Sequence, residues 1–277
     1  MRRCLYAAKS NHGPARGQPN PQRVGSQKIG DVFLRQVGRI CSTIGISIHH
    51  PFQLRWNFIK DPSSSNKFSG KEEIAHAITH GLGAVGSVAG LAILTTLAAS
   101  RGGAKLMVGV SVFGASMVIL YTASTLYHAL THKRAKDIFE LMDHGAIYLL
   151  IAGTFTPFAL SVLGGGWGWS SLGSIWTLAI LGIIYEVVFR RPWKWLSLTF
   201  YIGLGWLMTI VIKPLSAAMP SDGVWLIVAG GLAYTLGAVF YAWRAFPYHH
   251  AVWHVFVMAG TGFHYACVLL YVIPPAS

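Results

Sequence analysis

Residues 141–163 read LMDHGAIYLLIAGTFTPFALSVL, and this stretch decides the fold class. Its only charged side chain is Asp143, near the start, and the residues after His144 are apolar, aromatic, small or hydroxylated. A helix needs about 20 predominantly apolar residues to cross the hydrocarbon core of a bilayer. The stretch is therefore predicted to be a transmembrane helix.

Six further stretches of similar length and composition lie on either side of it. They cover residues 74–99, 104–130, 167–189, 195–212, 224–243 and 251–273. A bilayer offers no hydrogen-bond partners to free backbone groups, so helices are the expected structure for all of them. We expect an all-α fold: a polytopic membrane protein with seven transmembrane helices.

The composition of the whole chain agrees with this class. Hydrophobic residues make up 53% of the 277 residues and charged residues only 11%, less than half of the roughly 25% that is typical of soluble domains. The net charge is +13, and most basic residues lie in the N-terminal region or at the ends of the apolar stretches. Such a juxtamembrane excess is typical of membrane topology and of contact with anionic lipids. We expect membrane lipids as partners and no nucleic-acid binding; protein partners stay unknown.

Residues 1–71 differ from the rest of the chain. They are rich in Gly, Pro, Ser, Asn, Gln and Arg and show no sustained apolar period, so we predict a basic, mostly disordered tail followed by a transmembrane domain over 72–277. The Arg-rich, acid-poor start is also typical of organellar transit peptides. We prefer a solvated tail, or an upstream extension from a misassigned start codon.

The distribution of lysine and arginine predicts the orientation in the membrane. The loops after the second, fourth and sixth predicted helices carry Lys133, Arg134, Lys136, Arg190, Arg191, Lys194 and Arg244. The loops after the first, third and fifth carry only Arg101, Lys105 and Lys213. The N-terminus is therefore expected in the cytoplasm and the C-terminus outside.

This topology brings polar residues from several helices to one depth, near the inner leaflet. Glu72, Glu73, His76 and His80 open the first predicted helix, Ser124 and His128 end the second, Asp143 opens the third, and His250 and His254 open the seventh. Residues four apart share a helix face, so the last two histidines can present two nitrogens to one ion. Three neutral imidazoles match a catalytic zinc site with a fourth position open for water. The aspartate could hold that water or take its proton.

Other histidines have simpler interpretations. His76 and His80 are also four apart and could form a competing metal site. We prefer an interfacial helix start, where Glu72 and Glu73 favour the helix dipole and the two histidines bond neighbouring helices. His264 lies about 15 Å deeper along the last helix and is expected to be hydrogen-bonded within the bundle. His144 points roughly 100° away from Asp143 and is expected to orient it rather than bind metal.

These motifs resemble the haemolysin III branch of the progestin and adipoQ receptor family. The resemblance covers residue 72 to the end of the seventh predicted helix, and its motifs are Glu72-Glu73 with Thr79-His80-Gly81, Ser124-x-x-x-His128, Asp143-His144 through Thr156-Pro157-Phe158, and His250-x-x-x-His254. It implies a seven-helix fold with a cytoplasmic N-terminus and zinc at the cytoplasmic side. Adiponectin receptors and alkaline ceramidases are similar around this site and bind zinc through three histidines, with an aspartate and a serine nearby. By resemblance, the zinc ligands here are His128, His250 and His254, and the catalytic residues are Asp143 and Ser124.

The resemblance implies three kinds of function. The first is zinc-dependent hydrolysis of a lipid amide or ester in membrane lipid homeostasis, with Asp143 as general base and Ser124 as hydrogen-bond donor. The second is a pore-forming cytolysin, although the sequence shows no charged ring or polar stripe through the bilayer depth. The third is a non-catalytic sensor or receptor of the membrane state with structural zinc. The same ligands would serve an enzyme and a sensor, so enzymatic activity stays open. The expected location is a bacterial-type plasma (inner) membrane.

Overall fold

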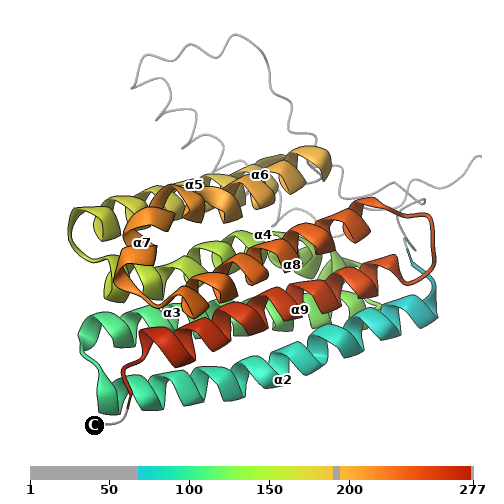
Figure 1. Ribbon diagram of the computed structural model, residues 1–277. Coiled ribbons are helices and arrows are strands. Elements are labelled where there is room, and N and C mark those ends of the chain that lie inside the picture. Colours follow the sequence, from blue (N-terminus) through green and yellow to red (C-terminus); the bar gives the residue numbers. More distant parts are fainter. Residues whose placement is uncertain (1–67, 190–193, 276–277) are drawn as a thin grey trace, which may run out of the picture. The chain divides into compact units, whose positions relative to one another are not determined.

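The computed structural model describes residues 68–189 and 194–275, and every regular element within those ranges is helical (Figure 1). Seven helices there are long and apolar enough to cross a membrane, which confirms the predicted fold class. These membrane-crossing helices comprise Gly70–Arg101, Ala104–Ala129, Lys133–Leu163, Gly165–Phe189, Lys194–Ala218, Ser221–Ala242 and His249–Val272. Which end of the bundle faces the cytoplasm remains a prediction from the lysine and arginine distribution.

Four of the seven are single α-helices: α2 (Gly70–Arg101), α3 (Ala104–Ala129), α5 (Gly165–Phe189) and α8 (Ser221–Ala242). Helix α4 (Lys133–Pro157) continues as the π-helix η2 (Phe158–Leu163), and α9 (His249–Cys267) continues as the π-helix η4 (Val268–Val272). The remaining membrane-crossing helix, fifth along the chain, is composite. It consists of α6 (Lys194–Trp206), the 3₁₀ turn η3 (Leu207–Val211) and α7 (Ile212–Ala218). It extends past the predicted end at residue 212. Pro214 explains the irregular turn, because its ring clashes with the carbonyl four residues earlier and it donates no hydrogen bond.

A capping box fixes the start of α2. Glu72 N donates to Ser69 Oγ at 3.3 Å, and Ser69 N donates to Glu72 Oε2 at 2.9 Å. The other carboxylate oxygen of Glu72 accepts from Tyr248 N at 3.1 Å, which ties this turn to the residue before α9. Of the tail predicted over 1–71, only 68–71 lie in the described part of the chain, and they form this cap and the first helical residues.

Helix α3 packs along both α2 and α4, while α8 packs along α9 (Figure 1). Small residues allow the close approach of α3 and α4: a Cβ at Gly109 would come within 2.8 Å of Pro157, and one at Gly153 would collide with Ser116. Helices α2 and α9 are also in contact. As a result, the starts of α2 and α9 meet the end of α3 at one end of the bundle.

Candidate metal centre

Four buried histidines of the described chain cluster at this end of the bundle. His76 comes from α2, His128 from α3, and His250 and His254 from the first turns of α9. Every pair of their ring centroids lies between 4.6 and 5.6 Å apart. The structure thus brings together the three histidines predicted as zinc ligands and adds a fourth.

The ring nitrogens of this cluster are short of hydrogen-bond partners. The Nε2 atoms of His128, His250 and His254, and both ring nitrogens of His76, are buried without a partner among the described residues. An unsatisfied buried polar group costs about 1–3 kcal/mol, so five such atoms in one place call for a ligand. Candidate ligand atoms of His76, His128 and His250 all lie within 4.8 Å of one another. These three buried histidines could therefore hold a metal ion.

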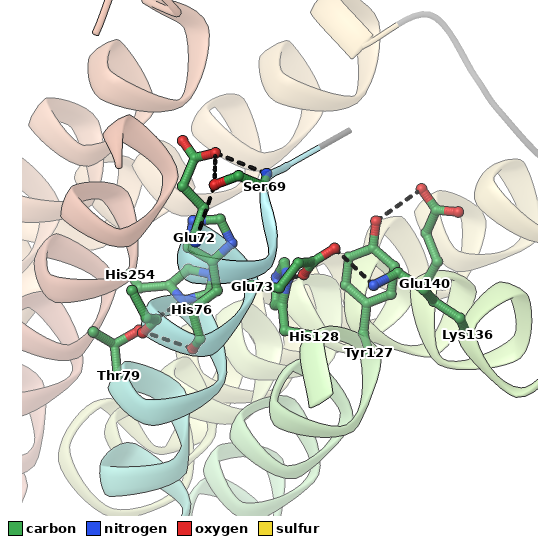
Figure 2. A network of polar contacts seen from close by, with 11 residues as sticks. Ser69, Glu72, Glu73, His76, Thr79, Tyr127, His128, Lys136, Glu140 and His254 are labelled. Carbon is green, nitrogen blue, oxygen red and sulfur yellow. Dashed lines mark hydrogen bonds and ion pairs between the residues drawn. The ribbon is translucent and has the colours of Figure 1, made fainter. Parts of the chain in front are cut away.

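A carboxylate sets the orientation of His128. Glu73 Oε2 lies 2.6 Å from His128 Nδ1, and Lys136 Nζ donates to Glu73 Oε1 at 2.7 Å (Figure 2). Because a carboxylate accepts, Nδ1 carries the hydrogen and Nε2 keeps its lone pair. Metal-binding histidines commonly have such a carboxylate partner on the nitrogen that does not bind the metal. The lone pair of His128 therefore faces the cluster.

Thr79 determines which ring nitrogen of His254 carries the hydrogen. Its Oγ1 lies 3.0 Å from His254 Nδ1 and 2.9 Å from each of the carbonyl oxygens of Ala75 and His76 (Figure 2). A hydroxyl has one hydrogen, and the carbonyls only accept, so the threonine donates to a carbonyl and accepts from Nδ1. His254 Nε2 is then the atom with the free lone pair. The ring of His254 stacks face to face on the ring of His80. The two ring centroids are 3.5 Å apart, and the angle between the ring planes is 8°.

Asp143 and Ser124 are buried at the same end. Ser124 lies one helical turn before His128 on α3, and Asp143 lies about three turns into α4, which packs along α3. Asp143 Oδ1 and Ser124 Oγ make no hydrogen bond within the described ranges. These two oxygen atoms are therefore available to a ligand.

The interpretation of His76 and His80 as histidines that bond neighbouring helices is wrong. Their exposed fractions are 0% and 1%, and none of their ring nitrogens has a hydrogen-bond partner among the residues described. The sequence did contain a signal: Glu73, His76 and His80 recur at i, i+3 and i+7, which is one face of a helix. That face of α2 lies toward the cluster.

The hydrogen bond predicted for His264 is present, whereas the orienting role predicted for His144 stays a prediction. His264 Nε2 donates to the carbonyl of Ile227 at 3.1 Å, well away from the cluster, although its Nδ1 has no partner in the described part of the chain. His144 lies outside the cluster, and its carbonyl oxygen accepts from Tyr201 at 3.2 Å. Its side chain lines a cavity in the bundle.

This cavity begins beside the cluster and runs into the interior of the bundle. Its volume is about 120 Å³, and its walls are mostly apolar and aromatic, with Leu150, Ile151 and Trp253 among them. His80, which stacks on His254, lies in its wall at the cluster end, and His264 lies further along. A long apolar group could therefore occupy the cavity with its polar end at the histidines.

Comparison with known proteins identifies the family. Residues 68–265 match the family model described as Haemolysin-III related. Hemolysin-3 of Bacillus cereus is 48% identical over 207 residues, which cover 75% of this chain and 94% of the relative. The Hemolysin-3 homolog of Bacillus subtilis is 46% identical over 206 residues, 74% of this chain and 97% of the relative.

A mammalian relative is more distant. The human monocyte to macrophage differentiation factor is 27% identical over 210 residues, which cover 72% of this chain and 84% of the relative. This similarity and the Bacillus relatives confirm the resemblance to the haemolysin III branch of the progestin and adipoQ receptor family. With seven apolar helices in the described ranges and a family match over most of its length, the chain belongs to the haemolysin-III related family of integral membrane proteins.

Proposed function

We propose that this protein is a zinc-dependent hydrolase of lipid amides or esters that acts in membrane lipid homeostasis. One observation carries the proposal: unpartnered imidazole nitrogens converge within the bundle, and His80, which stacks on His254 of this cluster, lines a mostly apolar cavity. The Bacillus relatives support a location in a bacterial-type plasma membrane. Membrane lipids are the partners that we propose.

Zinc fits the donor atoms that converge here. Neutral imidazole nitrogens are common zinc ligands, and a catalytic zinc site uses three protein ligands. We assign these to the Nε2 atoms of His128, His250 and His254, two of which have a partner on Nδ1 that leaves the Nε2 lone pair free. A zinc ion in this position would polarise a carbonyl group and lower the pKa of water.

Asp143 and Ser124 supply the proton transfer and the hydrogen bond of the reaction. Asp143 accepts a proton from the attacking water as the water oxygen bonds to the carbonyl carbon. The C–N or C–O bond to the leaving group then breaks, and Asp143 returns the proton to the leaving nitrogen or oxygen. Ser124 donates a hydrogen bond to the oxygen on which negative charge develops. The burial of both side chains supports these roles, because it excludes bulk water from the proton transfer.

The cavity indicates the substrate class. Its apolar walls would bind an acyl chain, and its cluster end at His80 would hold the carbonyl group beside the metal ligands. A single long-chain acyl group joined to an amide or ester suits this shape.

The test is fatty-acid release by the purified protein. Detergent-solubilised protein is incubated with a ceramide and with a diacylglycerol, each with a labelled acyl chain, and the free fatty acid is measured. We expect release from at least one substrate, loss on chelation and recovery with zinc. Asp143→Asn should bind zinc and release little fatty acid. If the zinc-loaded protein releases none from either substrate, hydrolysis is wrong for these classes, and a non-catalytic sensor becomes the better hypothesis.

Cytolysis is the second candidate, because two relatives are named as haemolysins. Dye release from lipid vesicles separates it from hydrolysis. A pore would release dye equally from wild type and from Asp143→Asn, whereas membrane damage by hydrolysis would stop with the substitution.

A further inference from the structure

His76 is the most enclosed member of the histidine cluster. Its side chain is fully buried, and neither ring nitrogen has a partner among the residues that the structure describes. Its ring centroid lies 4.7 Å from that of His128, 4.8 Å from that of His250 and 5.6 Å from that of His254. The trio with ligand atoms closest together contains His76 and leaves out His254.

The spacing of the four rings fits one tetrahedral ion. For zinc–nitrogen distances of roughly 2.0–2.1 Å, four imidazole centres around one ion should lie about 5 Å apart. The six observed centroid separations run from 4.6 to 5.6 Å. The separations of the ring centroids are therefore compatible with one ion that binds a nitrogen of each ring.

We propose that His76 is a fourth ligand of the metal, so that imidazoles from α2, α3 and α9 close the shell in this conformation. The inference rests on the metal site of the proposed function and not on hydrolysis. It adds a resting state to that function. Closed four-ligand shells are typical of structural zinc, whereas catalytic zinc keeps one position open. In such a resting state, His76 has to leave before the substrate carbonyl can take its place.

The first turn of α2 holds His76 in position. Glu73, one turn before it, bonds His128 and Lys136 (Figure 2). Glu72 bonds the backbone of Tyr248. The ring of Phe68 packs edge-on against His76 with centroids 4.6 Å apart. This turn is thus tied to α3, α4 and the start of α9. Release of His76 would require this turn to shift.

The experiment counts imidazole ligands in the purified full-length protein. X-ray absorption spectroscopy of the zinc-loaded wild type should give four imidazoles, and His76→Ala should give three. Chelator competition should show that His76→Ala binds zinc at least about tenfold more weakly, because changes in residues that only support the ligands already cost 10–100-fold. Added imidazole should restore the four-nitrogen spectrum of His76→Ala.

His80→Ala is the matched control. His80 lies one turn further along α2 and is equally buried, but its ring stacks face to face on that of His254 instead of belonging to the four-ring cluster. It should keep four imidazoles and should not respond to added imidazole. The count in the wild type needs no variant, so the test holds even if His76→Ala does not fold.

Two results would overturn the inference, and they are distinguishable. Three imidazoles in the wild type, with unchanged zinc affinity in His76→Ala, would remove His76 from the shell and leave the three-histidine site of the proposed function intact. A wild type that binds no zinc at all would remove both.

Discussion

Glu73 Oε2 lies 2.6 Å from His128 Nδ1, and this contact joins the first turn of α2 to the last turn of α3. The same carboxylate accepts from Lys136 on α4, so one side chain bonds groups on two neighbouring helices. The contact also fixes the tautomer of His128, because only a protonated Nδ1 can donate to a carboxylate. Glu73 therefore connects the packing of the bundle to the chemistry of the metal centre.

The first prediction concerns this contact. Glu73→Gln keeps the side-chain shape but removes the charge, and should lower zinc affinity by about 10–100-fold. Glu72→Gln is the control, since Glu72 is the adjacent carboxylate but bonds Ser69 and Tyr248 instead of a histidine. Chelator competition on both variants measures the difference. Equal affinities would mean that Glu73 only holds the helices together.

The second prediction separates the roles of Asp143 and Ser124 from those of the ligands. Asp143→Asn should keep zinc and lose most hydrolysis, because it removes the base. Ser124→Ala should keep zinc and lose less activity, because it removes only a hydrogen bond to the oxygen on which negative charge develops. Metal content and fatty-acid release are measured on the same samples. Loss of zinc from Asp143→Asn would make the aspartate a ligand instead.

Much of the fold follows from the lengths of the apolar stretches. Residues 104–130 were predicted as one helix, and α3 covers Ala104–Ala129. The end of the composite helix could not be predicted, because Pro214 looks like a helix breaker in sequence, yet the chain continues as α7 to Ala218. Apolar length therefore predicts that a helix is present better than it predicts where the helix ends.

The metal centre was predictable only in part. The convergence of His128, His250 and His254 followed from the alternating direction of the helices. The position of His76 depends on the rotation of α2 about its axis, which the bonds of Glu73 to His128 and Lys136 fix. Those bonds join residues 55 and 63 positions apart in the chain. Local sequence patterns do not show which residues of distant helices meet. They therefore predict neither these bonds nor the cavity walls, which come from several helices.

The third prediction tests the orientation in the membrane. Lys133 and Lys213 are exposed, one at the start of α4 and the other in α7, and the topology puts them on opposite sides of the membrane. With Cys4 and Cys41 replaced by serine, Lys133→Cys should react with an impermeant maleimide only from the cytoplasmic side and Lys213→Cys only from the outside. Reaction of Lys213→Cys from the cytoplasm would reverse the predicted topology and put the metal centre at the outer face.

The last prediction is that metal binding stabilises the bundle through the histidines. An ion held by His128 on α3 and by His250 and His254 on α9 links helices far apart in the sequence, and a ligand that binds only the folded state adds stability. At free zinc a hundredfold above its Kd, the gain is about 2.7 kcal/mol. The melting temperature of the purified protein should therefore rise with zinc and fall with chelator.

His250→Ala/His254→Ala should lose bound zinc and melt at the same temperature with or without chelator. His264→Ala is the matched control on the same helix: its ring bonds Ile227 outside the cluster, so this variant should keep the zinc response even if it melts earlier. Metal content and melting curves, recorded with and without chelator for all three proteins, decide the outcome. If the double variant keeps full zinc occupancy and the wild-type response, these two histidines do not bind the metal, and the assignment of His128, His250 and His254 as the zinc ligands is wrong.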